Sequence, residues 1–358
     1  MDIKVLLEEA VKMKASDIHI SVGVPPVFRL NGSLVRVSLN GEPLPPVTAE
    51  EAILAAQTLM TEEQYGKWNE NGELDFSYPL SGVGRFRVNV YKQRGCASIA
   101  IRPVPFKVPN LDELGVPEAV ITLADKVNGL VLVTGPTGSG KSTTLAAIID
   151  KINRERSCHI ITLEDPIEFL HKHQKSMVDQ REIGSDTKSL SVALRACLRQ
   201  DPDVILIGEM RDLETISTAI TAAETGHLVF ATLHTNNAPQ SVERIIDVFP
   251  PEQQEQVRVQ LSNTLQGVVS QQLVPLANGQ GRVLAAEVML VNAAIRNMIR
   301  EGKTHQMKNI MQTGARWGMQ TMEMALRDLV RSGRITREAA LEYCNDPDEL
   351  NRLIMTIG

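Results

Sequence analysis

The sequence predicts a two-domain protein, in which a small α+β domain precedes a doubly wound α/β domain. The chain has 358 residues, which at about 150 residues per domain corresponds to two domains. Apolar and polar residues alternate with a period of two in several places near the start of the chain, as they do in half-buried strands. Farther along, short aliphatic runs alternate with helical patterns, which is typical of a parallel sheet covered on both faces.

Two pairs of alternating segments in the first part of the chain predict β-hairpins. Residues 27–30 and 33–37 flank Asn31-Gly32, a dipeptide that accepts the positive φ angles of a tight type I′ turn. Residues 85–91 and 98–102 flank a turn around Arg94-Gly95. Helical patterns precede the two pairs, and we therefore expect an α+β domain over residues 1–102, with helices over 2–14 and 48–64.

A segment rich in proline follows this domain. Residues 103–117 include Pro103, Pro105, Pro109 and Pro117. Because proline lacks a backbone N–H and fixes φ, it interrupts helices and sheets, and we predict that this segment is the linker between the domains.

The second domain, over residues 118–358, contains the aliphatic runs that predict a parallel sheet. They are residues 130–133, 160–163, 204–207 and 228–231. A helix is expected over residues 189–199, because apolar side chains recur there on one helical face. The last hundred residues or so are predicted to be helical, apart from a turn at 279–281 and a strand over 283–290.

A glycine-rich segment follows the first of these strands and precedes a predicted helix. Its sequence is Gly135-Pro136-Thr137-Gly138-Ser139-Gly140-Lys141-Ser142-Thr143. The spacing matches G-x-x-x-x-G-K-[ST], in which backbone N–H groups wrap phosphates, the lysine reaches the β- and γ-phosphates and the hydroxyl binds Mg²⁺. These residues therefore predict a site for ATP, with Lys141 on the phosphates and Ser142 on Mg²⁺.

Carboxylates follow two other predicted strands. Glu164 and Asp165 end the second strand, and Glu209 lies just after the third. Because ligands bind outside the carboxyl ends of the strands in such sheets, we expect these acids beside the phosphates. There a carboxylate can hold Mg²⁺ or orient the attacking water, and the spacing alone does not decide which acid does which.

Two histidines flank the fourth predicted strand. His234 follows it, at the edge where phosphates are expected, and a ring N–H there could contact the γ-phosphate. His227 precedes the strand and is a second candidate for nucleotide binding, whereas His171 and His173 are expected at the surface.

Arginines of the first domain are candidates for stabilising charge on the transferred phosphate. Arg85, Arg87, Arg94 and Arg102 lie in or near one predicted hairpin. Arg85 and Arg87 fall on the face opposite to the apolar residues of their strand, so they point to solvent or to a partner.

The composition excludes several classes of protein. The net charge is −6 and aromatic residues make up 4%, which argues against a protein that coats nucleic acid. The four cysteines form no C-x-x-C pair, so neither a zinc site nor a disulfide framework is predicted. No signal peptide or membrane span is apparent, and we expect a cytoplasmic protein that reaches a membrane only through a partner.

These motifs, in this order, resemble those of the secretion-superfamily ATPases, and they are most similar to the type IV pilus retraction ATPases, the PilT family. The segments that carry the resemblance are residues 16–19, 85–89, 135–142, 161–168, 200–212 and 225–234. Residues 294–303 are similar to the C-terminal retraction motif of that family, with Met298 where a leucine is usual.

The resemblance implies a ring of six identical subunits, each with a PAS-like domain and a RecA-like P-loop ATPase domain that bind ATP between them. Domain movements would act on an inner-membrane platform protein and drive pilin disassembly, so the protein would lie at the periphery of the inner membrane. By the same resemblance Glu164 is the general base, Glu209 is the Walker B acid that acts on Mg²⁺, and three arginines contact the γ-phosphate: Arg87, Arg94 and Arg102. It also implies that changes at Ile295 or Arg296 spare ATP hydrolysis and abolish motility.

Four alternatives remain. A pilus-extension or type II secretion ATPase typically has a longer N-terminal region and a C-x-x-C zinc insertion, neither of which this sequence contains. An accessory retraction ATPase shares most of the motifs. A RecA-like DNA motor needs a basic channel, which a net charge of −6 does not favour. A regulator that binds ATP without hydrolysing it would not need both glutamates and the arginine hairpin.

Overall fold

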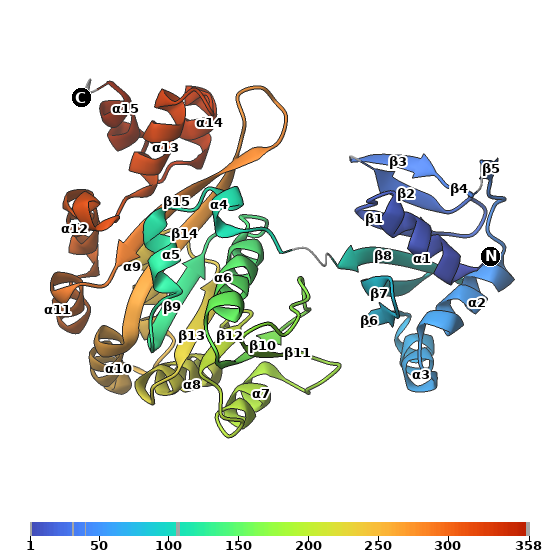
Figure 1. The fold of residues 1–358 in the computed structure, drawn as a ribbon, viewed down its shortest axis with the longest axis horizontal. Coiled ribbons are helices and arrows are strands. Elements are labelled where there is room, and N and C mark those ends of the chain that lie inside the picture. The colour runs from blue at the N-terminus through green and yellow to red at the C-terminus, as the bar shows by residue number, and fades with distance from the viewer. Residues whose placement is uncertain (1, 31, 40, 105–107, 356–358) are drawn as a thin grey trace. The chain divides into compact units, whose positions relative to one another are not determined.

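The chain divides into two compact units, which we describe separately (Figure 1). The computed structural model describes residues 2–30, 32–39, 41–104 and 108–355. The first unit comprises Met1–Lys107 with Pro166–Leu170, and the second comprises Val108–Asp165 with His171–Gly358. Of the predicted linker, residues 105–107 lie outside the described residues, as does Asn31 of the predicted turn.

The first unit is built on an antiparallel sheet with the strand order β3-β2-β1-β8-β7-β6. Both predicted hairpins are present: β2 pairs with β3, and β7 pairs with β8. A short ladder of β4 and β5 is added. The strands are β1 (Asp17–Ile20), β2 (Val27–Leu30), β3 (Ser33–Arg36), β4 (Ser38–Leu39), β5 (Glu42–Pro43), β6 (Glu73–Leu80), β7 (Gly84–Gln93) and β8 (Cys96–Val104).

Three helices accompany this sheet: α1 (Ile3–Lys12), α2 (Ala49–Leu59) and α3 (Glu62–Asn71). The single helix predicted over 48–64 is wrong, because the chain breaks after α2 and Thr61 starts a new helix. The Thr61 side chain accepts a hydrogen bond from the N–H of Gln64, and the Gln64 side chain accepts one from the N–H of Thr61 in return.

The linker predicted over residues 103–117 is too long. Pro103 lies within β8, opposite Phe86. A short helix, α4 (Leu111–Leu114), also forms within the predicted linker.

The second unit is a mostly parallel sheet with the order β11-β10-β12-β13-β9-β14-β15, in which only the last pair is antiparallel. The four predicted aliphatic strands are present, and so is the strand predicted over 283–290. The strands are β9 (Gly129–Thr134), β10 (His159–Glu164), β11 (Met177–Glu182), β12 (Val204–Ile207), β13 (Leu228–Leu233), β14 (Leu265–Pro275) and β15 (Arg282–Leu290). The sequence did not predict β11 or β14, because polar residues interrupt β11 and β14 was assigned to a helical region.

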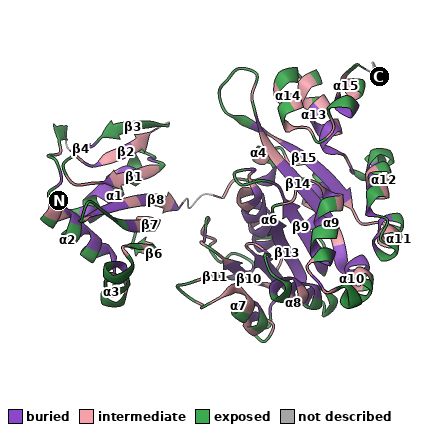
Figure 2. Cartoon of the chain, turned by 180° about the vertical axis from the view of Figure 1, so that it is seen from behind, coloured by how far each residue is buried: buried purple, intermediate pink, exposed green. Residues whose placement is uncertain are grey.

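Helices cover both faces of this sheet, whose strands are largely buried (Figure 2). Successive side chains of β9 point to opposite faces of the sheet. Leu130 and Leu132 therefore pack in one apolar cluster, and Val131 and Val133 pack in another. The helices are α5 (Glu118–Leu123), α6 (Lys141–Glu155), α7 (Leu190–Cys197), α8 (Leu213–Glu224), α9 (Ala238–Asp247), α10 (Pro251–Thr264) and α11 (Ala293–Glu301).

The C-terminal region consists of α12 (Met307–Thr313), α13 (Met322–Arg331), α14 (Arg337–Tyr343) and α15 (Pro347–Met355). Residues from α13, α14 and α15 form an apolar cluster with Val274 of β14 and Val283 of β15. In the described parts of the chain, no helix has both the length and the apolar character required to cross a membrane.

Candidate nucleotide-binding site

The glycine-rich segment forms a tight loop between β9 and α6. Gly135 has a φ of +138°, and a Cβ there would lie 2.3 Å from the backbone oxygen of Gln271. Gly140 has a φ of +90° and starts α6 without a side-chain cap. Only glycine fits at position 135 sterically. Glycine at position 140 leaves the N–H groups of the first turn of α6 without a capping side chain.

The polar groups of this loop suit a bound anion. The Lys141 ammonium donates to the backbone oxygens of Gly135 at 2.8 Å and Pro136 at 3.0 Å, so it lies over the loop. The buried Ser139 Oγ has no hydrogen-bond partner among the described residues. A helix N-terminus with exposed N–H groups and a nearby ammonium is a site for phosphate, and Ser142 and Thr143 lie half-buried in the same turn.

Glu164 and Glu209 lie at the same edge of the sheet as this loop. The register pairs Leu163 of β10 with Ile207 of β12, and the Gly208 N–H donates to the Leu163 oxygen at 2.8 Å. Glu164, the last residue of β10, is therefore level with Gly208, and Glu209 is the next residue after it, so both glutamates lie at the carboxyl ends of neighbouring strands. A Cβ at Gly208 would lie 3.2 Å from that same oxygen, so a small residue favours this close approach.

Glu164 is oriented by two neighbours. The Thr162 hydroxyl donates to Glu164 Oε1 at 2.6 Å, and the side-chain amide of Gln180 donates to the same oxygen at 3.1 Å. Gln180 lies on β11, the strand that the sequence did not predict, so its role had no signal in the motifs.

Glu209 is held by two basic side chains. Arg211 Nε lies 2.8 Å from Glu209 Oε1, and His234 Nε2 lies 3.0 Å from Oε2. The Arg211 guanidinium lowers the pKa of Glu209, burial opposes this, and His234 lowers the pKa further. Glu209 is therefore ionised at neutral pH, and both of its oxygens have basic partners.

The two histidines that flank β13 lie at opposite edges of the sheet. His234 follows the last residue of β13 and contacts Glu209, as described above. The His227 oxygen accepts from the N–H of Gly129, the first residue of β9, whereas the phosphate loop follows the last residue of β9. The structure thus brings His234, and not His227, to the phosphate loop of its own chain. His227 Nδ1 lies 2.9 Å from the Ala222 oxygen, a contact that closes the turn after α8.

The predicted arginines lie in the first unit. Arg87 on β7 is exposed and stands directly opposite Arg102 on β8. Arg102 donates from Nε and Nη2 to Asp17 Oδ1, at 3.0 Å and 2.7 Å. Arg94 occupies the two-residue turn of this hairpin with a φ of +52°. The action of these residues on a nucleotide stays a prediction.

The donor set of the second unit fits Mg²⁺ bound together with phosphates. The candidate ligands are oxygens: the Ser142 hydroxyl and the carboxylates of Glu164 and Glu209. Mg²⁺ prefers such ligands and usually takes the remaining positions from water and substrate phosphates. Among the described residues, no group of three or more His, Cys, Asp or Glu side chains could hold a metal ion.

Comparisons with known proteins extend these observations to the whole chain. The family model of the type II/IV secretion system proteins matches residues 1–342. The type IV pilus retraction ATPase PilT of Pseudomonas aeruginosa is 49% identical over 97% of this chain and 99% of its own length. The type IV pilus ATPase PilU of the same organism is 43% identical over 100% of this chain and 92% of its own length.

A solved structure is also similar to the chain. The crystal structure of the pilus retraction motor PilT with bound ADP matches with a TM-score of 0.91 and 51% identity, and the match covers 98% of this chain and 99% of that one. The mixed α/β architecture described above is therefore shared with a nucleotide-binding relative.

Proposed function

Since the chain belongs to the type II/IV secretion system protein family, we propose that it is an ATP-hydrolysing motor that powers the retraction of type IV pili. One observation carries this proposal: the identity of 49% to a retraction ATPase extends over 97% of this chain and 99% of the relative. Both units are therefore included in the match.

The site suggests how hydrolysis proceeds. ATP binds with its phosphates on the loop 135–143, where Lys141 turns from the backbone oxygens to the phosphates. Ser142 and Glu209 would hold Mg²⁺, which would supply positive charge to offset the negative charge of the phosphates. Glu164, held by Thr162 and Gln180, orients the attacking water and accepts its proton as general base. His234, beside Glu209, contacts the γ-phosphate.

The arginines of the first unit complete the proposed machinery. Arg87, Arg94 and Arg102 supply positive charge to the γ-phosphate, either in their own subunit or in a neighbouring one. The placement of Arg87 opposite Arg102 supports this role, because like charges directly across two strands repel and an anion between them would relieve the repulsion. In the structure, the Asp17 carboxylate forms an ion pair with the Arg102 guanidinium.

The assembly part of the proposal follows from the family resemblance. We propose a homohexamer that works at the cytoplasmic periphery of the inner membrane and passes its domain movements to a platform protein of the pilus machinery. His227, which lies at the other end of β13 from the phosphate loop of its own chain, is proposed to act on nucleotide only within such a ring.

A second candidate is an accessory role beside a principal retraction ATPase. The identity of 43% to PilU over the full chain supports it, although the identity to PilT is higher. An extension or type II secretion ATPase is less well supported, because the sequence has no C-x-x-C pair.

Two experiments test the proposal: deletion of the gene in the source organism, and measurement of ATP hydrolysis by the purified protein. Deletion of the gene is expected to leave cells that have surplus pili and do not twitch, and loss of pili would instead indicate an extension motor. The purified full-length chain should hydrolyse ATP in the presence of Mg²⁺, with Glu164→Gln as the inactive control. A deletion strain that twitches normally would point to the accessory role.

A further inference from the structure

Glu287 is a carboxylate in an unusual position, in the middle of β15. Only 3% of its surface is exposed. A buried carboxylate is unfavourable unless hydrogen bonds replace its water. The residue is also absent from every motif discussed above, so its burial calls for a separate explanation.

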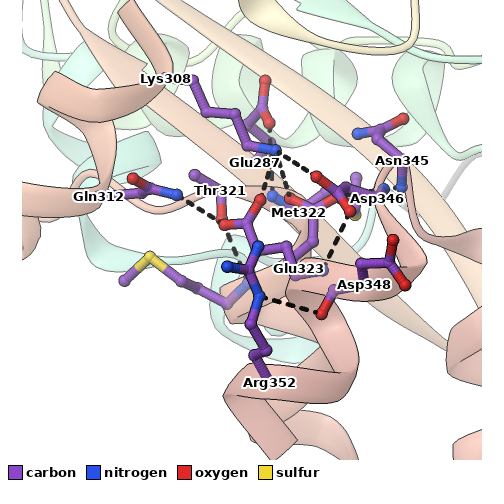
Figure 3. A network of polar contacts seen from close by, with 12 residues as sticks. Glu287, Lys308, Gln312, Thr321, Met322, Glu323, Asn345, Asp346, Asp348 and Arg352 are labelled. Carbon is purple, nitrogen blue, oxygen red and sulfur yellow. Dashed lines mark hydrogen bonds and ion pairs between the residues drawn. The ribbon is translucent and has the colours of Figure 1, made fainter.

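The explanation is that Glu287 holds the first residues of two helices. Oε1 accepts the N–H of Ala238, the first residue of α9, at 2.7 Å. Oε2 accepts the N–H of Met322, the first residue of α13, at 3.3 Å (Figure 3). The positive ends of two helix dipoles thus point at one carboxylate. Burial and the nearby Glu323 carboxylate raise the pKa of Glu287, and both N–H groups and Lys308 oppose this, so that the pKa is raised to about 7.

The α9 side of this contact leads to the candidate nucleotide site. Residues 234–237 connect β13 to α9, and His234 at their start lies 3.0 Å from Glu209. Asn237 at their end caps α9 by accepting the N–H of Gln240 at 2.9 Å. Only three residues therefore separate His234, which lies beside Glu209, from Ala238, which Glu287 holds.

The α13 side leads to the C-terminal helices. Gln320 exchanges two backbone hydrogen bonds with Val288, at 2.9 Å and 3.0 Å, so the segment before α13 is attached to β15 beside Glu287. The fully buried Glu323 accepts the N–H groups of Asn345 and Asp346, both at 3.0 Å, just before α15.

Lys308 of α12 joins the same group of side chains. It pairs with Glu349. Lys308 Nζ also lies 3.7 Å from Asp346 Oδ2 (Figure 3). The polar network thus connects α12, α13 and α15, and Glu287 connects that network to α9.

We propose that Glu287 is a positioning residue that couples the nucleotide state at His234 to the C-terminal helices α12, α13 and α15. The inference rests on the proposed function, because it takes ATP binding and hydrolysis as the events that are transmitted. When His234 shifts toward a γ-phosphate, Ala238 shifts with it. Met322 must then follow, because one carboxylate holds both N–H groups.

The test uses the full-length chain with Glu287→Gln. The amide keeps the size of the side chain, but its NH₂ group faces one backbone N–H, so one of the two helix starts loses its acceptor. We expect kcat to fall by about 2- to 30-fold, the range typical of residues that modulate coupling, with the KM for ATP within about twofold of the wild type.

Glu323→Gln is the matched control, because it makes the same change in a buried carboxylate of the same network that does not contact α9. It is expected to lower the urea midpoint and to leave kcat within about twofold. An equal fall of kcat in both variants would show that Glu287 acts only through stability, and would overturn the proposal.

A double-mutant cycle with His234→Ala identifies the route. If Glu287 acts through His234, Glu287→Gln has little further effect on kcat in the His234→Ala background. Additive losses would contradict the coupling.

Hydrogen exchange provides a readout that does not need hydrolysis. A non-hydrolysable ATP analogue with Mg²⁺ should change protection over residues 320–326 in the wild type and leave it unchanged in Glu287→Gln. No change in the wild type would refute the inference. A chain that shows these effects but does not restore twitching would instead contradict the retraction function.

Discussion

Ile295, in the segment that resembles the retraction motif, has no exposed surface. It lies on α11 in the main apolar cluster of the second unit, together with Val257 and Leu261 of α10. Ile295 therefore cannot be a surface contact to a partner, and Ile295→Ala should act through the stability of α11 and α10.

The size of this effect follows from the burial. Truncating a fully buried isoleucine to alanine costs about 2–5 kcal/mol, which includes the cavity that remains. A typical domain is stable by about 5–15 kcal/mol, so the variant loses a large part of its stability. Arg296→Ala should behave similarly, since Arg296 Nη1 donates to the oxygens of Ser262 at 2.8 Å and Asn263 at 3.0 Å, at the end of α10.

The assay compares these variants with a change on the exposed face of the same helix. Arg300 is exposed, so Arg300→Ala should change stability by less than about 0.5 kcal/mol. Urea unfolding at one fixed protein concentration gives the midpoints, and ATP hydrolysis and twitching are measured beside it. Met298→Leu, a swap of similar volume at a half-buried site, is the conservative control.

One result would refute the reasoning. If Ile295→Ala had the wild-type urea midpoint and rate of ATP hydrolysis and still abolished twitching, the side chain would be acting outside the core. The expectation from the motif alone would then be right. A loss of twitching in Arg300→Ala at normal stability and ATP hydrolysis would instead assign partner contact to the exposed face of α11.

Three further predictions concern the site and its electrostatics. Glu164→Gln should bind ATP normally and lose most hydrolysis, by about 10²-fold or more, because the general base is removed; near-normal turnover would exclude this role. Gly135→Ala should abolish nucleotide binding in a titration with a fluorescent ATP analogue, because its Cβ would lie 2.3 Å from the Gln271 oxygen, and Gly279→Ala, in an exposed turn with no atom near its Cβ, is the control. The pKa of Glu287 is raised to about 7 in the folded chain, against an ordinary value of 4.5. As the pH rises, the Glu287 carboxyl group therefore loses its proton at a lower pH in the unfolded chain than in the folded chain. The wild type should therefore lose about 3 kcal/mol of unfolding free energy relative to Glu287→Gln between pH 4.5 and 7, at about 1.4 kcal/mol for each pKa unit. A difference that does not change with pH would show that Glu287 has an ordinary pKa.

Much of the candidate site was predictable because its residues follow strands. The aliphatic runs of β9, β10, β12 and β13 are recognisable in sequence, and parallel strands bring their carboxyl ends to one edge. The pattern of strands therefore predicts that the phosphate loop, Glu164, Glu209 and His234 lie together. The same rule distinguishes His227, which precedes its strand and lies at the other edge.

The residues that support the site could not be predicted in this way. Gln180 contacts Glu164 from β11, whose polar residues hide its strand character, and Gln271 packs its backbone against Gly135 from β14. Both contacts depend on which strands become neighbours, and strand order is decided by packing over the whole sheet rather than by local pattern.

The sequence by itself determined the chemistry of this protein: a phosphate loop, strand-end carboxylates and a hairpin with arginines, because local spacing fixes what such residues can bind. Only the tertiary structure decided which of them have partners. It paired Glu209 with Arg211 and His234, paired Arg102 with Asp17, and buried Ile295, which lies in the segment that resembles the retraction motif. It also placed Glu287 between the first residues of α9 and α13, which are 84 positions apart in the chain. Such contacts between distant segments leave no local pattern, since they form only when the helices pack on the sheet.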